Sequence, residues 1–483
     1  MPVGTQYSPS RLQVAAPSAA AEVGTKGLID AGAGGYVALG ELYRPMTGSW
    51  PAVDATNGPL TADAGITNVA PTLTGLTQYK WNSGKFNTQS QNWVAVPTSN
   101  GVSANQCCQN VTTPRGNNYA STGLGFPCHT DFSFIADTAK VIVVYYQTTT
   151  GMANQGISTS AHEVQIFAEQ DGVMKGIRSV PAQWPNGSGG NQLFYRVITF
   201  KEARKREFRV MLSVGCWLDS VYIDTGGQIS KAPNRPVLFG CFGDSWAEGA
   251  GNVFSSVGGN GSVYGTTWPS NASLLYSNTA IQYAIATGFA CIIMNQGGTG
   301  YVNSNGAGQN EDSSVAGFTP FISTGQVDYF WTTFGSRYPC ALVAGMWNDG
   351  TAATAAPITT TFAALATKGY NKLLAKDANM PIMVQGCQCK SITVGDGRDQ
   401  ANTGLKNAVA ALQAAGKPML GFIDDLADYG NNGSVYTDIW SVDIGPDGLH
   451  PTVKGGDNIG QRRAKRSAQF LIARSRVAQM IAA

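Results

Sequence analysis

The stretch VLFGCFGDSW, residues 237–246, is an apolar run that ends in Gly243, Asp244, Ser245 and Trp246. A short apolar run of this kind is typical of a strand buried on both faces of a parallel sheet. A strand followed by a sharp, glycine-containing turn is how hydrolases lift a nucleophilic hydroxyl clear of the sheet. The stretch therefore makes Ser245 a candidate nucleophile, although a serine in this position is by itself more often a turn residue or a helix cap.

Downstream of Pro236, strand-like apolar runs alternate with helical stretches. The expected strands are VLFGCF (237–242), ACIIMNQ (290–296), CALVAGMW (340–347), PIMVQGC (381–387) and PMLGFID (418–424). The expected helices cover residues 278–288, 359–376, 401–416 and a C-terminal stretch from about 454. In the last of these, the basic run 461–476 is interpreted as a solvated helix face, with an inward stripe through Ala464, Ala468, Leu471 and Ile472. Five strands with intervening helices predict right-handed crossovers and a parallel sheet covered on both faces.

Polar, glycine-rich motifs follow these strands. They are GDSW (243–246), NQGGTG (295–300), WNDG (347–350) and, at longer range after the fifth strand, DGLHP (447–451). Because ligands bind outside the carboxyl ends of the strands in an open parallel sheet, we expect the four motifs to meet at one edge.

In this order and at these strand ends, the four motifs resemble the sequence blocks of the SGNH (GDSL) hydrolases, a family of esterases, lipases and carbohydrate deacetylases. The match covers about residues 235–475. The resemblance implies an α/β fold, with a flavodoxin-like three-layer α/β/α hydrolase domain. It also implies a serine hydrolase that uses no cofactor.

The resemblance assigns a catalytic triad to Ser245, His450 and Asp447. A serine hydroxyl needs a base to take its proton, and an imidazole titrating near pH 6.5 is suited to that task. Asp447, three residues before His450, is placed to accept the imidazole Nδ1 proton and to stabilise the imidazolium. Taken alone, His450 would be an ordinary surface histidine and Asp447 a turn residue.

The resemblance also assigns an oxyanion hole to the backbone N–H groups of Ser245 and Gly300 and to the side-chain amide of Asn348. Gly297 is the alternative to Gly300 if the loop register differs. Donors of this kind stabilise negative charge as it develops in the transition state. Read by itself, Asn348 followed by Asp and Gly is simply a turn signal.

Two tryptophans flank these residues, and the family pattern is altered around them. Trp246 and Trp347 are candidates for an aromatic wall that binds substrate, and packing against neighbouring loops is the alternative. The third block usually carries a glycine two residues before its asparagine, but this chain has Met346 there and Gly345 one step earlier.

Upstream of the hydrolase-like region, from about 76 to 232, alternating runs recur at 140–148, 162–170, 193–200, 207–214 and 219–225. Short strands at this spacing predict an antiparallel β-sandwich, similar to a jelly roll. The basic segment KEARKREFR (201–209) is interpreted as a solvated hairpin edge, with a grip for an anionic polymer as the alternative. Residues 1–75, rich in Ala, Gly, Thr and Pro, predict an extended arm that becomes ordered by packing against another surface, such as that of other subunits. With the sandwich at 76–232, the hydrolase domain is expected to cover 233–483.

Composition excludes several classes of function. The chain has 32 Lys and Arg against 30 Asp and Glu, a net charge of +2, so nucleic acid is not an expected partner. No apolar run approaches the roughly 20 residues that cross a bilayer, and no signal peptide is recognised. With three histidines and nine cysteines, two adjacent at 107–108 and two more at 387 and 389, the chain lacks zinc-site spacing, and buried thiols are expected instead of metal ligands.

The leading functional prediction is O-deacetylation of a polysaccharide such as a capsule, an O-antigen or a cell-wall glycan. Absence of a metal-site pattern favours ester over amide cleavage, because N-deacetylation of sugars commonly uses a metal ion. The arm and the low charge also resemble bacteriophage tailspikes, which predicts a virion or extracellular location, attachment through the N-terminal region and a homotrimer. A lipase or thioesterase and a non-catalytic virion receptor-binding protein are the alternatives.

Overall fold

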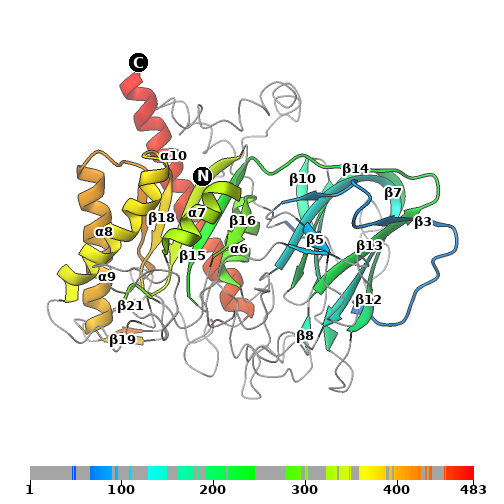
Figure 1. The fold of residues 1–483 in the computed structure, drawn as a ribbon, viewed down its shortest axis with the longest axis horizontal. Coiled ribbons are helices and arrows are strands. Elements are labelled where there is room, and N and C mark those ends of the chain that lie inside the picture. Colours follow the sequence, from blue (N-terminus) through cyan, green and yellow to red (C-terminus); the bar gives the residue numbers. More distant parts are fainter. Residues whose placement is uncertain are drawn as a thin grey trace.

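The protein is described from a computed structural model. Its described residues are 46, 48–49, 66–89, 93–95, 108–110, 129–148, 161–162, 164–170, 172–177, 182–183, 191–213, 216–244, 278–294, 300–302, 322–333, 337–346, 349, 358–387, 391–393, 396–425, 430–431, 435–437, 451 and 453–482. A body of antiparallel strands and a body of parallel strands with helices lie side by side along the long axis of the molecule (Figure 1). No described helix has the length and apolar composition needed to cross a membrane.

The antiparallel body is built on one large sheet. Its strands are β1 (Gly48–Ser49), β2 (Ile66–Thr67), β3 (Leu76–Lys80), β4 (Asn87–Thr88), β5 (Trp93–Ala95), β6 (Cys108–Asn110), β7 (His129–Thr148), β9 (Val164–Gln170), β10 (Val173–Ile177), β12 (Asn191–Ser213), β13 (Cys216–Asp224) and β14 (Ile229–Lys231). A separate pair joins β8 (Ala161–His162) to β11 (Ala182–Gln183). The main order is β1-β10-β9-β12-β7-β13-β6-β5, and every pairing in the large sheet is antiparallel except that of β1 with β10. The predicted antiparallel architecture is confirmed.

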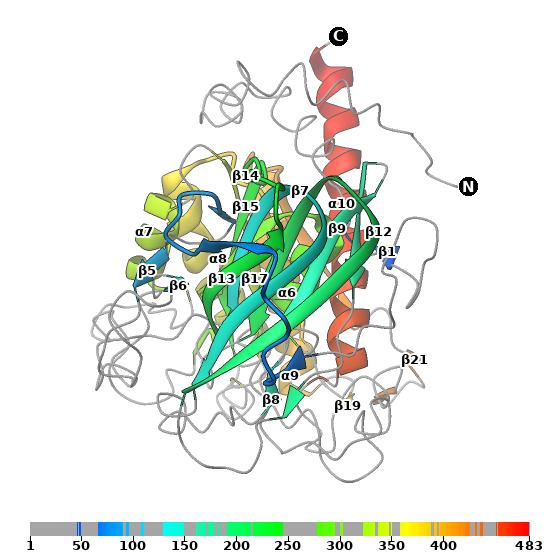
Figure 2. The same ribbon diagram turned by 90° about the vertical axis from the view of Figure 1, so that its right-hand side faces the viewer.

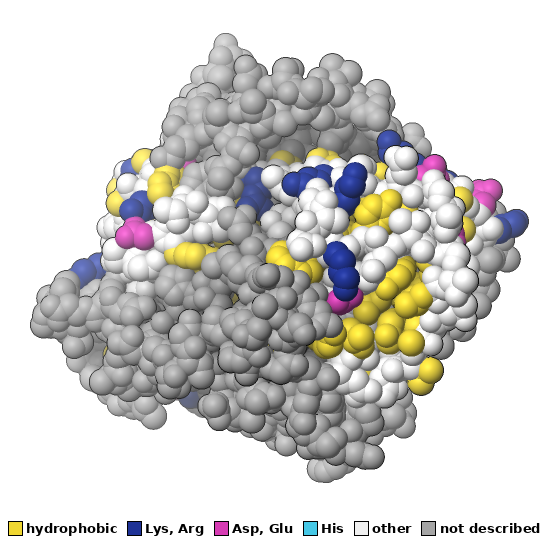
Figure 3. Space-filling model, turned by 45° about the vertical axis from the view of Figure 1, so that its right-hand side comes forward, with side chains coloured by type: hydrophobic (Ala, Val, Ile, Leu, Met, Phe, Trp, Pro, Cys, Tyr) yellow, Lys and Arg dark blue, Asp and Glu magenta, His cyan; other side chains and the backbone are white. Residues whose placement is uncertain are grey.

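Side chains alternate between the two faces of this sheet, as the pleat of a strand requires. In β7, Val141, Val143 and Tyr145 enter the main core of the antiparallel body, whereas Ile142 and Val144 belong to a smaller cluster on the opposite face. Hydrophobic side chains are also visible on the part of the surface that the antiparallel strands form (Figure 3).

The hairpin predicted at residues 201–209 is wrong, because β12 runs through the segment as one strand. The predicted solvation holds for its first half, where residues 201–203 and 205 are exposed. The register of β12 against β7 shifts between residues 199 and 204, and Arg206 is buried there. The guanidinium of Arg206 lies 4.2 Å over the ring of Phe200. Its Nη1 donates to three main-chain carbonyls around the bend, each at 3.4 Å: those of Thr138, Glu202 and Arg204. In place of the expected hairpin turn, the strand bends and the buried Arg206 donates hydrogen bonds to the carbonyls at the bend.

The parallel sheet confirms the strands predicted downstream of Pro236. Its order is β16 (Ala290–Ile293), β15 (Val237–Gly243), β17 (Tyr338–Ala344), β18 (Ile382–Gln385) and β20 (Leu420–Ile423), and every neighbouring pair is parallel. This is the flavodoxin-like order, in which the second and third strands of the chain lie on either side of the first. A small antiparallel sheet joins β19 (Ser391–Thr393), β22 (Val435–Thr437) and β21 (Gly430–Asn431).

Helices cover both faces of the parallel sheet, as predicted (Figure 1). They are α6 (Thr279–Thr287), α7 (Thr324–Thr333), α8 (Ile358–Lys376), α9 (Gly397–Ala414) and α10 (Val453–Ala482). Leu238 and Phe242 of β15 point into the core that holds α7, α8 and α9, whereas Phe239 and Cys241 point into the core that holds α6. Helix α7 was not predicted; its sequence TGQVDYFWTT buries just three side chains and has a weak apolar period.

The two bodies share a core, and β12 and β9 pass in front of α6 in Figure 2. Phe167, Met174 and Met211 of the antiparallel strands belong to the same cluster as α6 and one face of the parallel sheet. A fully buried ion pair of the antiparallel strands lies at this boundary: Arg209 Nε and Nη2 lie 2.9 and 2.6 Å from the Asp131 carboxylate. Arg209 Nη2 also donates across the boundary to the carbonyl of Phe289 at 3.0 Å. The contact therefore holds α6 and β16 against the antiparallel strands.

Candidate active site

Strand β15 ends at the motif that suggested a nucleophile. All seven of its residues are buried, and it is hydrogen-bonded to β16 on one side and to β17 on the other. The next residue, Asp244, is also buried. Ser245 and Trp246 follow directly and lie outside the described residues, so the structure places the turn up to Asp244.

The loop after β17 meets this turn at Gly345. Its φ of +137° is in the range that favours glycine, and an added Cβ would lie 2.7 Å from Asp244 Oδ2. Met346, which stands where the family pattern has glycine, is buried in the core instead. In this chain the glycine one step earlier therefore provides the close approach between the two loops.

The loop after β16 meets the same edge at Gly300, which is buried. An added Cβ at Gly300 would lie 2.3 to 2.4 Å from the carboxyl atoms of Asp349, so this position cannot take a side chain without displacing that carboxylate. Asp349, which comes after β17, accepts hydrogen bonds from the backbone N–H groups of Tyr301 and Val302, both at 2.8 Å. The loops after β15, β16 and β17 thus converge at one edge of the sheet, as predicted.

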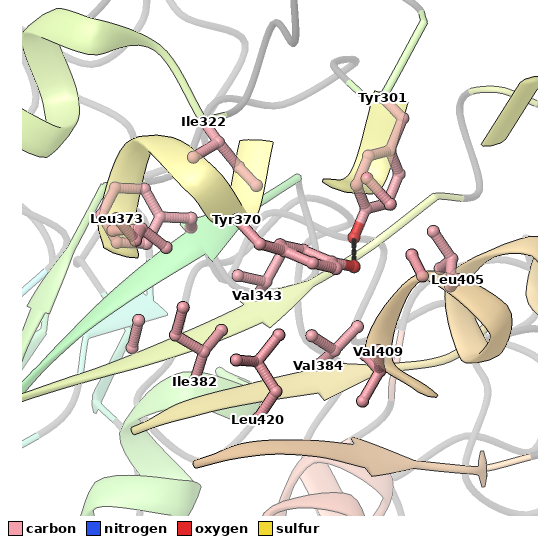
Figure 4. Close-up of a cluster of buried hydrophobic side chains, with 14 of the residues drawn as sticks. Tyr301, Ile322, Val343, Tyr370, Leu373, Ile382, Val384, Leu405, Val409 and Leu420 are labelled. Atoms are coloured by element: carbon pink, nitrogen blue, oxygen red, sulfur yellow. Dashed lines mark hydrogen bonds between the residues drawn. The ribbon is translucent and has the colours of Figure 1, made fainter. Parts of the chain in front are cut away.

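Tyr301 anchors the loop from its other side. Its hydroxyl lies 2.7 Å from that of Tyr370 on α8, inside a cluster of buried apolar side chains (Figure 4). Burial, together with the neighbouring phenol, raises the pKa of Tyr301 well above its usual value, so the group stays neutral. The pair therefore acts as a neutral hydrogen bond that fixes the loop to the helix layer.

A charged group lies beneath the edge, on the side of the sheet that α10 covers. Arg463 of α10 is fully buried, with its Nε 4.0 Å from the carboxylate of Asp425, which also accepts a hydrogen bond from Gln385. Burial lowers the pKa of Arg463 to about 10, although Asp425, Cys241 and Asp244 oppose the shift. The basic run 461–476 was interpreted as a solvated helix face, and that interpretation is wrong for Arg463.

Among the predicted site residues, Gly300 is described and lies at the expected edge. The other predicted residues lie outside the described part of the chain: Ser245, Trp246, Trp347, Asn348, Asp447 and His450. The alternative oxyanion donor, Gly297, lies outside it as well. Each of the four motifs contains at least one described residue, namely Asp244, Gly300, Asp349 and Pro451.

The described residues contain no group of three or more His, Cys, Asp or Glu side chains that could hold a metal ion. Five cysteines of the described part are buried: Cys216, Cys241, Cys291, Cys340 and Cys387. They agree with the expectation of buried thiols at these positions. Burial raises the pKa of Cys340 to about 12, which makes it a poor nucleophile.

Sequence reasoning missed Asp349 and Arg463. In WNDG the family resemblance points to the asparagine as an oxyanion donor, and nothing in the spacing indicates that the next carboxylate binds a different loop. For Arg463, an inward helical stripe through Ala464 and Ala468 was predicted and is buried as expected, and the arginine lies beside that stripe. The position of Arg463 next to Ala464, which was expected to face inward, is the sequence feature that could have indicated its burial.

Comparisons with known proteins agree with this architecture. No protein-family model matches the sequence, and no curated protein matches it. Among solved structures, the chain is similar to the salicylyl-acyltransferase SsfX3 from a tetracycline biosynthetic pathway, with a TM-score of 0.53 at 10% identity over 82% of this chain and 98% of that one. This likeness supports the fold of both bodies together.

Two esterases align over similar lengths with lower scores. The acetyl xylan esterase Est2A from the rumen bacterium Butyrivibrio proteoclasticus gives a TM-score of 0.46 at 12% identity, covering 83% of this chain and 98% of that one. A family two carbohydrate esterase from Cellvibrio japonicus gives 0.42 at 11% identity, covering 82% and 98%. At scores below 0.5 these two likenesses add nothing to the description of the fold.

Proposed function

We propose that this chain is an SGNH-type serine esterase that removes O-acetyl groups from a polysaccharide. The observation that carries the proposal is the convergence of three loops at the carboxyl edge of a flavodoxin-like sheet. Asp244 lies against Gly345, and Asp349 lies against Gly300. Asp244 of the first motif therefore lies next to the loop that leads into the third motif, and the second and third motifs meet at Gly300 and Asp349.

The mechanism follows from the residue types that the four motifs carry. Ser245 attacks the ester carbonyl while His450 takes its proton, and Asp447 holds the imidazole in the productive tautomer. The oxyanion accepts hydrogen bonds from the backbone N–H groups of Ser245 and Gly300 and from the side-chain amide of Asn348. His450 then protonates the departing sugar hydroxyl, and a water activated by the same imidazole releases acetate from the acyl-enzyme.

The experiment measures acetate released from a panel of acetylated capsular and cell-wall polysaccharides, together with turnover of p-nitrophenyl acetate. Ser245→Ala should abolish both activities. Ser230→Ala, a substitution of an exposed serine on β14, is the matched control and should leave them unchanged. Wild-type protein that releases no acetate, or a Ser245→Ala variant as active as the control, would rule the proposal out.

Two related functions are distinguished from O-deacetylation by their substrates and products. A lipase or thioesterase would prefer longer acyl chains, so a series of p-nitrophenyl esters from acetate upward distinguishes it. An acyltransferase is a second candidate because SsfX3, to which the fold is similar, is a salicylyl-acyltransferase. It would transfer the acyl group to an added alcohol in preference to water, which a product ratio measures.

The polysaccharide partner, the virion attachment and the trimer stay predictions from sequence. A non-catalytic receptor-binding role is the outcome that inactive wild-type protein would favour. Measuring acetate release therefore tests both readings.

A further inference from the structure

The carboxylate of Asp349 binds backbone groups of the candidate site. The side chain is fully buried, and its two oxygens accept from two consecutive backbone N–H groups: Oδ2 from Tyr301 and Oδ1 from Val302, both at 2.8 Å. The backbone N–H of Asp349 itself donates to the carbonyl of Met346 at 3.1 Å, which closes a turn directly after β17. One residue therefore ties the loop after β16 to the end of β17.

The carboxylate also sets how closely the loop approaches. The three heavy atoms nearest to an added Cβ at Gly300 would be Oδ1, Cγ and Oδ2 of Asp349, at 2.3 to 2.4 Å. Gly300 thus leaves no room for a Cβ beside the carboxylate, while the next two residues donate to it. Hydrogen bonds to an ionised acceptor are shorter and stronger than neutral ones, so this three-residue segment is held firmly.

We infer that Asp349 is a positioning residue that sets the geometry of the oxyanion hole. This inference rests on the proposed function, in which Gly300 donates its N–H to the oxyanion. Asp349 does not touch the reacting atoms in this scheme. It fixes the Gly300 backbone relative to β17, the strand that leads into Asn348. Both carboxylate oxygens accept hydrogen bonds from the loop after β16, so backbone N–H groups solvate the buried carboxylate.

The consequence concerns the rate of the chemical step. An oxyanion donor stabilises the transition state when it lies within hydrogen-bonding distance of the developing charge, and removing one donor costs about 100- to 1,000-fold in kcat. A loop displaced by about 1 Å loses most of that stabilisation. Losing the Asp349 carboxylate should therefore lower kcat, with little effect on the binding of substrate.

The experiment compares Asp349→Ala and Asp349→Asn with Asp224→Ala. Asp224 is a matched control because its Oδ2 also accepts from two consecutive backbone N–H groups, Ala139 and Lys140, both at 2.8 Å, but within the antiparallel body. With p-nitrophenyl acetate, Asp349→Ala should lower kcat about 100-fold and change KM less than about threefold. Asp224→Ala should keep wild-type kcat while its melting temperature falls.

Asp349→Asn tests whether the carboxylate acts through its two acceptors. The amide oxygen can still accept from one N–H, but the amide NH₂ faces the other donor. We expect a kcat between those of the wild type and Asp349→Ala, about tenfold below wild type. This conservative variant also keeps the inference testable if Asp349→Ala fails to fold.

A double-mutant cycle with Gly300→Ala separates positioning from general stability. In the wild-type background the new Cβ meets the carboxylate, so kcat should fall strongly. In the Asp349→Ala background the obstructing atoms are gone, and the same substitution should cost at least tenfold less. Additive losses would show that Asp349 does not act through Gly300 and would contradict the inference.

The outcomes distinguish the two levels of the proposal. If wild-type protein and Ser245→Ala hydrolyse the ester equally, the proposed function fails. If the wild type is active and Ser245→Ala is not, but both Asp349 variants keep wild-type kcat, the positioning role is overturned while the esterase stands. A reduced kcat in the Asp349 variants, with non-additivity at Gly300, supports the inference.

Discussion

The buried imidazole of His129 should make the stability of the protein depend on pH. His129 begins β7 at the boundary between the two bodies, and its Nε2 lies 3.5 Å from the Sγ of Cys291 on β16. Burial lowers the pKa of His129 from 6.5 to about 4; Asp131 opposes this shift and Arg209 adds to it. The folded protein therefore keeps the ring neutral at pH values where the unfolded chain protonates it.

The sign and size of the effect follow from proton linkage. Below pH 6.5 the unfolded state binds more protons at this residue than the folded state, so the free energy of unfolding falls as the pH is lowered from 6.5 towards 4. A shift from 6.5 to about 4 corresponds to about 3 kcal/mol in full. At pH 5.0 the loss relative to pH 7.5 should be about 2 kcal/mol.

The measurement is urea-induced unfolding, followed by tryptophan fluorescence, of the wild type, His129→Gln and Cys291→Ala at pH 7.5 and 5.0. Carboxylates elsewhere titrate equally in all three proteins, so the comparison isolates the imidazole. The destabilisation caused by His129→Gln should shrink by about 2 kcal/mol at the lower pH, because the variant has no ring to protonate. Cys291→Ala keeps the ring and should retain the wild-type dependence on pH. An equal effect of His129→Gln at both pH values would refute the reasoning.

Three further outcomes are expected. Gly345→Ala should lower the melting temperature and kcat, because it combines a φ of +137° with a Cβ 2.7 Å from Asp244. The expected cost in unfolding free energy is about 2 kcal/mol. The control Gly84→Ala, with a φ of +71° and open space around it, should cost about half as much and leave kcat unchanged. Tyr301→Phe and Tyr370→Phe should each cost about 1 kcal/mol of unfolding free energy, and calorimetry should find the double variant less destabilised than the sum. Ester hydrolysis should persist after dialysis against a chelator, and inactivation that added metal reverses would contradict the proposed metal-free mechanism.

The parallel sheet was predictable because each of its strands is buried on both faces. Continuous apolar runs such as VLFGCF and CALVAG then stand out from their surroundings, and the intervening helices carry clear apolar periods. Helix α7 was not predictable from its sequence, because threonine, glycine and glutamine stand at positions where an apolar stripe would indicate a helix. Its Gln326 side chain donates to the carbonyl of Met294 at 2.7 Å, a tertiary contact that no local pattern encodes.

Segment 201–209 shows a second limit of reading charge from sequence. Lys and Arg usually mark solvated surface, and Lys201 and Lys205 are indeed exposed. Arg206 and Arg209 of the same run are buried, one over a phenylalanine ring and one in an ion pair with Asp131. A long aliphatic stem and a planar head allow arginine to fill space and bind carbonyls or carboxylates inside a protein, so its charge alone does not locate it.

The two aspartates of the candidate site explain why the motifs have the composition they do. Asp244 precedes the proposed nucleophile and lies against Gly345, while Asp349 follows the proposed amide donor and lies against Gly300. In each case a carboxylate from one loop meets a glycine from the next, because a glycine leaves room for a buried acceptor and frees the backbone to approach it. The acids therefore join β15 to β17 and β17 to β16, independently of any role in proton transfer. The pairing of an acid with a glycine is therefore the described feature that links the three loops, whatever chemistry the neighbouring serine and asparagine perform.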